Sequence, residues 1–294
     1  MAMETLDHQD HRCVMSTTTN DTPSTRRPGD AERPILVIGA SGKTGRRVLQ
    51  SLVASGRATR AASRTSPTRF DWDEPRTWAP ALAGAGAAYV VAPERPTDVD
   101  RFLAEASNAG LERLVLLSAR HPEQGGDGVM PAIEAAVRSG PLPATVLQPS
   151  WFVQNFTEGM FVHEVADGVL SLPVGQGREP FIDTADIAAV AVAALTDGRH
   201  AGATYELSGP ESMTFDDAVR RLGAASGRDL RFEPVEPGPW ADAAAAFLPA
   251  PVVELLLNLF AAIRDGDNDH LSLGVEHALG RAPHSFEQAL DETT

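Results

Sequence analysis

A glycine-rich turn follows the first buried strand that the sequence predicts, and this turn constrains the fold most. Residues 35–38 (Ile-Leu-Val-Ile) form a continuous apolar run, typical of a strand buried on both faces. Gly39, Gly42 and Gly45 come next with the spacing G-x-x-G-x-x-G, before helical periodicity over 46–53. In such a turn the glycines allow a tight bend, close approach of a pyrophosphate and close helix–strand packing. The helix start then presents free N–H groups to the phosphates.

The same segment opens an alternation of strands and helices. Further strands are expected at 59–63, 70–72, 87–92, 114–117 and 144–147. Helical patterns over 78–83, 98–109 and 130–138 lie between most of them. Strands that alternate with helices form a parallel sheet with right-handed crossovers. The sequence therefore predicts an α/β fold, a Rossmann-type doubly wound parallel sheet.

The pattern changes after residue 149. Residues 151–165 are aromatic-rich with helical spacing, and later segments include strand-like runs at 180–183 and 205–207 and an apolar helix over 252–263. Asp186 is expected to cap an alanine-rich helix, while Thr214 and Asp217 have the spacing of a capping box.

These patterns divide the chain into three predicted parts. Residues 1–33 are expected to form a disordered tail, and 34–205 an NAD(P)-binding Rossmann-type domain in which 151–180 contributes to a cap. Residues 206–294 are expected to form a smaller α/β substrate-binding cap at the C-terminal side of the sheet.

Two other interpretations of the glycine turn deserve comparison. Gly42, Lys43 and Thr44 match the end of the nucleotide-triphosphate motif G-x-x-x-x-G-K-[ST], but that motif needs a glycine where Val37 stands. A tight turn without any ligand is the other alternative. The position after the first strand of an alternating pattern favours a dinucleotide.

The end of the second predicted strand indicates which dinucleotide is bound. An NAD-specific site usually carries Asp or Glu there to bind the ribose 2′-hydroxyl, but residues 60–64 contain no acid. Arg64 offers a planar guanidinium suited to a 2′-phosphate, and Lys43, the only lysine of the chain, adds a second positive charge. We predict NADPH over NADH by at least about 1.4 kcal/mol, or tenfold. The alternative for Arg64 is a solvated surface charge.

Charge and cysteine content exclude other classes of function. Asp and Glu number 40 against 25 Lys and Arg, giving a net charge of −15 that would repel nucleic-acid phosphates. No apolar run approaches the roughly 18 residues that span a bilayer. Cys13 is the only cysteine, so no intramolecular disulfide or thiolate metal cluster can form. We expect a cytoplasmic protein that acts on a small molecule without nucleic acid, membrane or metal.

The sequence cannot supply the Tyr-x-x-x-Lys pair that many reductases of this size use. Tyr89 and Tyr205 are the only tyrosines, and Pro93 and Gly209 stand four residues after them. Hydride transfer to a neutral ketone requires a proton donor. An iminium ion requires none, because hydride converts it to a neutral amine, and a quinone can be protonated by water.

Two residues near the fifth strand are candidate catalytic groups. Ser118 follows that strand, at the sheet edge where parallel sheets place their chemistry, and His121 lies in the next loop. The alternative for His121 is a loop residue without a catalytic task. Glu134 is expected to be solvated, and Asp183, like Asp186, to cap a helix.

The aromatic residues after the sixth strand allow two interpretations. Trp151, Phe152, Phe156 and Phe161 could form the core face of a helix, or they could line a pocket for a flat or cationic substrate.

Residues 34–290 resemble the NmrA-like branch of the atypical short-chain dehydrogenases/reductases. The resemblance rests on 39–45 (GASGKTG), 62–64 (ASR), 116–119 (LLSA), 148–156 (QPSWFVQNF), 180–183 (PFID) and 186–188 (DIA). Within this branch, 70–82 (FDWDEPRTWAPAL) and 149–152 (PSWF) resemble bacterial relatives of festuclavine dehydrogenase, an ergot-alkaloid enzyme. That enzyme family reduces an iminium with NADPH and without a Tyr–Lys pair.

The resemblance implies roles by position. The adenosine phosphates would contact Gly39, Ser41, Gly42, Lys43, Thr44, Gly45 and Arg64, and the adenine would lie near Asp71 and Trp72. Ala92, Pro93, Ser118 and Pro149 would line the nicotinamide path, and Trp151 and Phe152 would border the substrate. The sequence thus favours an NADPH-dependent reductase of an iminium, quinone or enone. The alternative is a non-catalytic NADP(H)-binding redox sensor.

Overall fold

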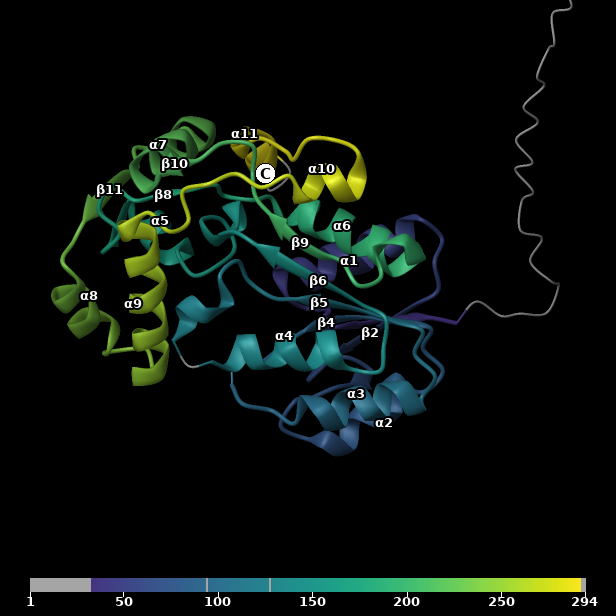
Figure 1. The fold of residues 1–294 in the computed structure, drawn as a ribbon. Helices are drawn as coiled ribbons and strands as arrows, with labels where there is room; N and C mark the ends of the chain where they lie inside the picture. The colour runs from purple at the N-terminus through teal and green to yellow at the C-terminus, as the bar shows by residue number, and fades with distance from the viewer. Residues whose placement is uncertain (1–32, 94, 127, 292–294) are drawn as a thin grey trace, which may run out of the picture. The chain divides into compact units, whose positions relative to one another are not determined.

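A computed structural model describes residues 33–93, 95–126 and 128–291. The segment 1–32, which belongs to the predicted disordered tail, lies outside the described residues. The central element is a seven-stranded, entirely parallel sheet in the order β3-β2-β1-β4-β5-β6-β9 (Figure 1). Its strands are β1 (Ile35–Ile38), β2 (Thr59–Ser63), β3 (Thr68–Arg69), β4 (Ala87–Val91), β5 (Arg113–Leu117), β6 (Ala144–Pro149) and β9 (Thr204–Leu207). This sheet confirms the predicted α/β fold.

Helices cover both faces of the sheet (Figure 1). One face carries α1 (Lys43–Ala54), α6 (Thr184–Thr196) and α10 (Gly274–Leu279), and the other carries α2 (Trp78–Leu82), α3 (Val99–Asn108) and α4 (Val129–Ser139). Successive side chains of a strand point to opposite faces. Leu36 and Ile38 of β1 therefore pack in one core, and Ile35 and Val37 pack in the other.

Further elements form a cap beyond the carboxyl ends of β5 and β6 (Figure 1). They are α5 (Val162–Asp167), β7 (Val169–Leu172), β8 (Arg178–Glu179), β10 (Met213–Thr214), α7 (Phe215–Ser226), β11 (Arg231–Pro234), α8 (Pro237–Ala244), α9 (Ala250–Asp265) and α11 (Phe286–Asp291). β7 pairs with β11 in parallel, and β8 pairs with β10 in antiparallel orientation. A third apolar core holds the cap together, with Phe156, Phe181, Phe215, Phe260 and Phe286 all nearly inaccessible to solvent.

Short 3₁₀ helices complete the described structure at η1 (Pro75–Thr77), η2 (Pro122–Gly125), η3 (Val153–Asn155) and η4 (Gly198–His200). Thr214 caps α7 as its spacing predicts, because its hydroxyl accepts the Asp217 N–H. Among the residues that the structure describes, none belongs to a helix with both the length and the apolar character needed to cross a membrane.

The third predicted strand, at 70–72, is wrong. The observed β3 ends at Arg69, because the Asp71 carbonyl accepts hydrogen bonds from the Trp78 indole and the Thr77 hydroxyl instead of a neighbouring strand. The Phe70 ring packs edge-on against the Trp72 ring, with 4.9 Å between centroids. Side-chain bonding and aromatic packing thus override the local strand preference.

The helix predicted over 151–165 is also largely wrong. The Ile182 N–H donates to the Trp151 carbonyl and the Val153 N–H donates to the Ile182 carbonyl, which holds the start of this segment extended. Only η3 and, later, α5 are helical. In the next helix, α6, the N-cap is Asp183, whose carboxylate accepts the Ala185 N–H, and Asp186 lies in the first turn. The predicted capping role is therefore confirmed for Asp183 and wrong for Asp186.

Candidate active site

The glycine turn has the backbone geometry that a phosphate-binding loop requires. Gly39 has a φ of +79°, which favours glycine, and a Cβ on Gly45 would lie 2.2 Å from the Gly39 carbonyl oxygen. Ser41 and Gly42 are exposed, and Gly42 precedes α1 without any side-chain cap. The first N–H groups of α1 are thus presented at an open glycine surface, and the loop fits a dinucleotide pyrophosphate.

Lys43 extends from α1 toward the cap. Its Nζ donates to Asn155 Oδ1 at 2.5 Å and lies 5.5 Å from the centroid of the Phe152 ring. The predicted role of Lys43 was limited to the phosphates. The structure adds the contacts with Asn155 and Phe152, while the neighbouring Thr44 is buried.

The residues assigned to the adenosine half follow β2 and β3 in the chain. Arg64 directly follows β2 and is exposed, so its guanidinium can reach a 2′-phosphate. The Trp72 indole N–H donates to the Val91 carbonyl at the end of β4, which fixes that ring beside Ala92 and Pro93. Asp71 Oδ1 accepts the Asp73 N–H at 3.0 Å.

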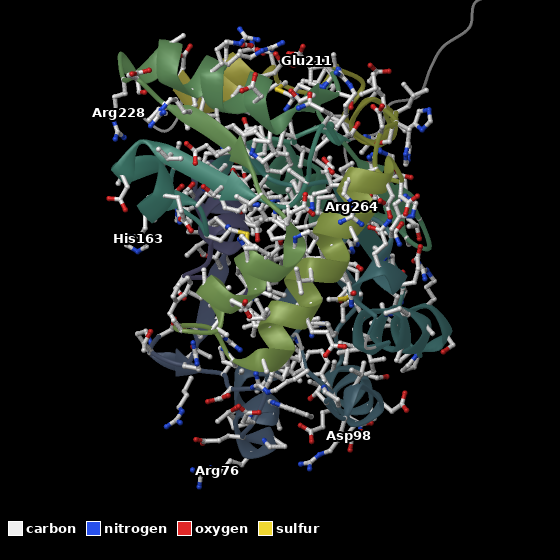
Figure 2. The ribbon with its side chains drawn as sticks, turned by 90° about the vertical axis from the view of Figure 1, so that its left-hand side faces the viewer. Arg76, Asp98, His163, Glu211, Arg228 and Arg264 are labelled. Carbon is white, nitrogen blue, oxygen red and sulfur yellow. The ribbon has the colours of Figure 1, made fainter. Side chains whose placement is uncertain are left out.

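A cavity of about 1080 Å³ lies where β5 and β6 end. Its wall toward the cap is apolar and comes mainly from α8, α9 and the turn between them, with Trp240, Phe247, Leu255, Leu259 and Phe260. Figure 2 looks onto these two helices, and His163 of α5, another lining residue, points outward there. Lys43, Ser118 and Pro149 also line the cavity, so it adjoins the glycine turn through Lys43. Its size and lining are typical of a small-molecule site.

The four aromatic residues after β6 were predicted either to line a pocket or to pack in the core, and the structure shows both. Trp151, Phe152 and Phe161 line the cavity, whereas Phe156 is fully buried in the cap core. The rings of Trp151 and Phe161 are parallel within 1°, with centroids 5.9 Å apart. A flat ring can therefore find stacking partners on this wall.

Ser118 lies at the cavity with its hydroxyl bound to a buried carboxylate. Its Oγ donates to Glu134 Oε1, and Gln148 Nε2 donates to the same carboxylate at 2.9 and 3.1 Å. Arg138 forms an ion pair with Glu134 at 2.5 Å. The prediction that Glu134 is solvated is wrong, because Gln148 and Ser118 hold it against the sheet at 1% exposure.

The structure does not bring His121 to the cavity wall. Its φ is +48°, its Nδ1 lies 3.4 Å from Glu123 Oε1, and its ring meets His270 edge-on at 5.6 Å. Neither tyrosine lines the cavity either. Burial raises the pKa of the Tyr89 hydroxyl, and the Tyr205 hydroxyl bonds His200 Nδ1 at 2.8 Å.

Sequence reasoning missed a buried polar cluster at the cavity, formed by Arg120, Glu179 and Asn268. Glu179 accepts the Trp151 N–H at 3.1 Å and the Asn268 Nδ2–H at 2.9 Å. Burial raises the pKa of the Glu179 carboxyl to about 7. The sequence could have indicated Arg120, because it lies two residues after the predicted site residue Ser118. Nothing in the sequence indicates that Glu179 and Asn268 lie beside it.

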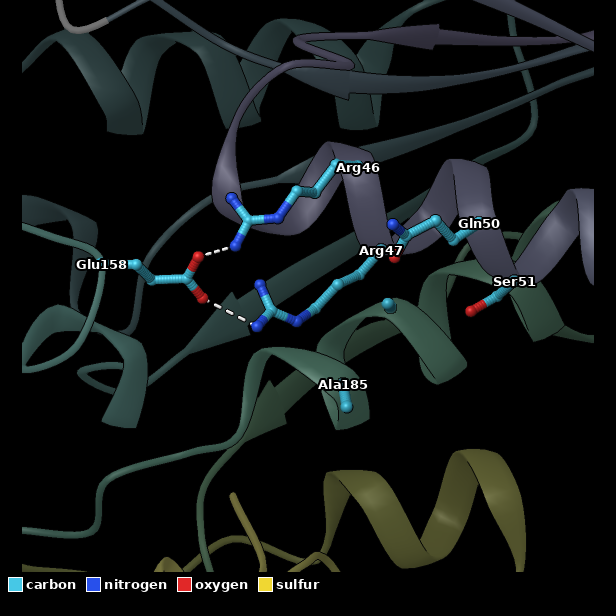
Figure 3. Close-up of a pocket in the computed structure, with 7 residues that line it drawn as sticks. Arg46, Arg47, Gln50, Ser51, Glu158 and Ala185 are labelled. Carbon is cyan, nitrogen blue, oxygen red and sulfur yellow. Dashed lines mark ion pairs between the residues drawn. The ribbon is translucent and has the colours of Figure 1, made fainter. Parts of the chain in front are cut away.

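Two polar contacts fasten the segments around the site. Glu158, between η3 and α5, forms ion pairs with Arg46 and, at 2.7 Å, with Arg47, and these residues border a small pocket of about 480 Å³ (Figure 3). The segment from η3 to α5, which carries Asn155 and Glu158, is thereby tied to α1.

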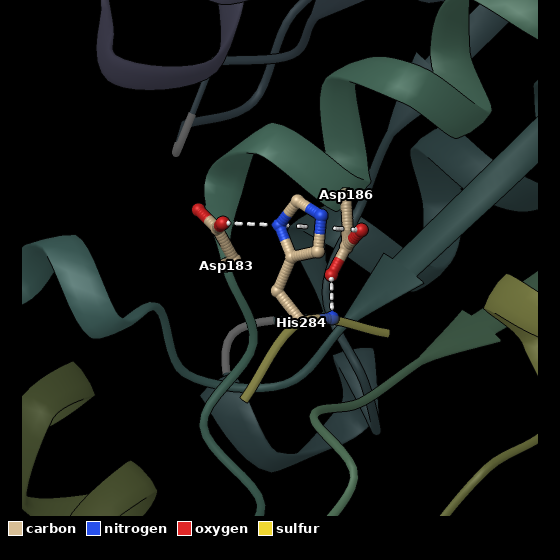
Figure 4. Close-up of side chains that lie close together, drawn as sticks. All are labelled: Asp183, Asp186 and His284. Atoms are coloured by element: carbon tan, nitrogen blue, oxygen red, sulfur yellow. Dashed lines mark hydrogen bonds and ion pairs between the residues drawn. The ribbon is translucent and has the colours of Figure 1, made fainter. Parts of the chain in front are cut away.

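The second contact joins the C-terminal segment to α6. His284 Nδ1 lies 2.9 Å from Asp183 Oδ2, and the His284 N–H donates to Asp186 Oδ2 at 2.7 Å (Figure 4). A carboxylate pair with a histidine could ligate a metal ion. However, Arg281 already pairs with Asp186 at 2.7 Å and Gln154 donates to Asp183, so the group forms a closed polar network.

Comparison with curated proteins gives relatives that match over most of their lengths. No family model matches the chain. Prestalk A differentiation protein A of Dictyostelium discoideum is 29% identical over 279 residues, covering 88% of this chain and 92% of that protein. The uncharacterized oxidoreductase YesF of Bacillus subtilis strain 168 is 32% identical over 270 residues, covering 87% and 94%. Agroclavine dehydrogenase of Claviceps fusiformis is 30% identical over 274 residues, covering 86% and 94%.

Solved structures share the fold at lower identity. Triphenylmethane reductase of Citrobacter sp., crystallised with NADP(H), matches with a TM-score of 0.72 and 20% identity, covering 89% of this chain and 100% of that one. The NADPH-dependent quinone oxidoreductase QOR2 of Escherichia coli also matches with a TM-score of 0.72 and 20% identity, covering 88% and 100%.

Proposed function

Because the chain belongs to the NmrA-like branch of the atypical short-chain dehydrogenases/reductases, a family that includes the agroclavine dehydrogenases, we propose an NADPH-dependent reduction of a small organic electrophile. The electrophile is an iminium, a quinone or an enone. Bound NADPH supplies the hydride. Gly39, Ser41, Gly42 and Arg64 would hold its phosphates, and the rest of the chain would orient the substrate and exclude water.

The observation that carries this proposal is the cavity between the glycine turn and the cap. Lys43 belongs to α1 and also lines the cavity, so a dinucleotide on the turn and a substrate in the cavity would be neighbours. The apolar wall from α8 and α9 would exclude water from that junction. A protein that only sensed the cofactor would not require a second, mainly apolar cavity of about 1080 Å³.

The positions of the tyrosines support a reaction without a Tyr–Lys pair. Tyr89 is buried within β4 and Tyr205 is bonded to His200, so neither reaches the cavity. Ser118 does reach it, and its hydroxyl donates to Glu134. Ser118 Oγ can therefore accept a hydrogen bond from a nicotinamide carboxamide or from the substrate.

Steady-state consumption of NADPH tests the proposal. The purified full-length protein is mixed with NADPH and, separately, with N-methyl dihydroisoquinolinium, naphthoquinone and cyclohexenone, and the absorbance of the reduced nicotinamide is followed. Substrate-dependent loss of absorbance with at least one compound is expected. Tight binding of NADPH with no turnover across the whole panel would contradict a reductase and favour a sensor of NADP(H).

A further inference from the structure

Polar side chains line several parts of the cavity, and one buried part of its wall contains Arg120, which is 5% exposed. Arg120 Nη1 donates to the carbonyls of Asn268 at 3.2 Å and His270 at 3.0 Å, and Nη2 lies 2.8 Å from Glu206 Oε1. Its Nε–H is buried and has no hydrogen-bond partner among the described residues. A buried donor left unpaired destabilises the folded protein, so a ligand that brings an acceptor gains affinity there.

The neighbouring residues complete this polar part of the wall. Asn268 donates through Nδ2 to Glu179 Oε2, while its own Oδ1 has no partner within the described part of the chain. Glu179 is fully buried, and the charged groups that act on its carboxyl are Arg120 and Asp269. Arg120 favours the carboxylate form, while burial and Asp269 favour the protonated form.

We propose that the Arg120–Glu179–Asn268 cluster anchors the carbonyl oxygen of the substrate, so that the enzyme prefers quinones and conjugated enones to iminium ions. This inference rests on the proposed reductase function. A carbonyl oxygen has lone pairs that the Arg120 Nε–H can bind once a small side-chain shift opens this buried donor to the cavity, whereas an iminium nitrogen has none. The Lys43 ammonium also lines this cavity and favours developing negative charge on oxygen, but Glu164 and Asp167 line it too, so the preference comes from the hydrogen bond at Arg120 and not from net charge.

Reduction of a conjugated carbonyl compound places negative charge on its oxygen, which the cluster can stabilise and protonate. A conjugated carbonyl compound gains one hydride, with NADPH becoming NADP⁺, and the displaced π electrons move to the carbonyl oxygen. The resulting enolate or hydroquinone oxygen is stabilised by the Arg120 N–H and then takes one proton. Since the pKa of Glu179 is about 7, this carboxyl is partly protonated near neutrality and can pass a proton through the cluster, regaining it from water.

A purely structural role for the cluster is the competing explanation. Arg120 binds two carbonyls and a carboxylate of segments that follow β9 or belong to it, so it also fastens the region around 268–270 to the end of β5. A structural role would reduce stability and all activities together. An anchoring role would change the preference between carbonyl and iminium substrates.

The first experiment uses Arg120→Lys, which keeps the charge but removes the Nε–H. The selectivity, kcat/KM for naphthoquinone divided by kcat/KM for N-methyl dihydroisoquinolinium, is expected to favour the quinone in the wild type and to fall at least tenfold in the variant. Calorimetry without cofactor is expected to show at least tenfold weaker binding of tetralone, an unreactive bicyclic ketone analogue. The matched control is Arg113→Lys. Arg113 is the first residue of β5, its guanidinium donates to the Leu195 carbonyl of α6, and it does not line the cavity.

The outcomes separate this inference from the proposed function. A wild-type protein that consumes NADPH with neither compound refutes the reductase proposal itself. A wild type that prefers the iminium, or a variant whose two activities fall equally with unchanged tetralone binding, overturns the anchoring site alone. If Arg120→Lys does not fold, Glu179→Gln decides. The wild type is expected to lose naphthoquinone reduction above pH 7, where Glu179 loses its proton, and Glu179→Gln is expected to remove this pH dependence. A variant with the same pH profile as the wild type would overturn the inference.

Discussion

Replacing Gly42 by alanine separates cofactor binding from folding. Gly42 has φ −78° and ψ 170°, an extended conformation open to any residue, and a Cβ there would touch only the Gly39 carbonyl oxygen, at 3.3 Å. Removing a glycine also restricts the unfolded chain, which stabilises a protein by about 0.4–1 kcal/mol. We therefore expect the free energy of unfolding of Gly42→Ala to stay within about 1 kcal/mol of the wild type.

Binding of NADPH should fall nevertheless. The added methyl group lies on the exposed surface of the turn, where the pyrophosphate must approach the backbone. Losing one hydrogen bond to a charged phosphate costs about 1.5–3 kcal/mol, so Kd should rise roughly ten- to hundredfold. Isothermal calorimetry with NADPH measures this change, and thermal melting of the same samples reports the fold.

Two further glycine variants serve as comparisons for Gly42→Ala. Gly45→Ala would place a Cβ 2.2 Å from the Gly39 oxygen, so its melting temperature should drop. Gly238→Ala in α8 meets nothing within 4 Å, so it should leave NADPH binding unchanged and should not lower the melting temperature. Wild-type affinity for NADPH in Gly42→Ala would refute the assignment of the turn to the pyrophosphate.

Four further outcomes are expected. Arg64→Ala should weaken NADPH about tenfold and leave NADH unchanged, because only NADPH carries the 2′-phosphate; equal losses for both would contradict this role. The pKa of Glu179 is raised to about 7 from 4.5, so the folded protein holds a proton that the unfolded chain loses between these values. Stability to urea should therefore fall by up to about 3 kcal/mol as pH rises from about 4.5 to 7, and Glu179→Gln should abolish that slope. His121→Ala should change kcat for naphthoquinone reduction less than threefold, since the ring does not line the cavity. A much larger loss of kcat would indicate that His121 is the proton donor. A chelator should leave the melting temperature unchanged, because the network around His284 is closed by protein groups; a drop would indicate a bound metal.

Local patterns in the sequence predicted the elements that make the cofactor-binding sheet. Residues 35–38 and 59–63 are strands with the predicted bounds. The first is a continuous apolar run, typical of a strand buried on both faces, and the turn with three glycines after it leaves few alternatives. The N-cap Thr214 was equally local, since its partner Asp217 lies three residues away.

Local sequence patterns could not predict contacts between segments that are distant in the chain. Residues 151–153 are extended only because Ile182 pairs with them, about 30 positions later, and this contact overrides the helical spacing of the aromatic side chains. Glu134 has a helical position that suggests solvent, but Gln148 and Ser118 from two strands hold it in the interior. The polar cluster at the cavity likewise joins 120, 179 and 268, which no spacing rule connects.

The central claim is that a dinucleotide on the glycine turn presents its nicotinamide to the cavity lined by Trp151 and Phe152. A crystal structure of the full chain with NADPH tests this most directly. We predict the pyrophosphate against Gly42, the 2′-phosphate within hydrogen-bond reach of Arg64, and the nicotinamide ring facing the cavity. A cofactor bound elsewhere, or a nicotinamide turned away from the cavity, would contradict the account.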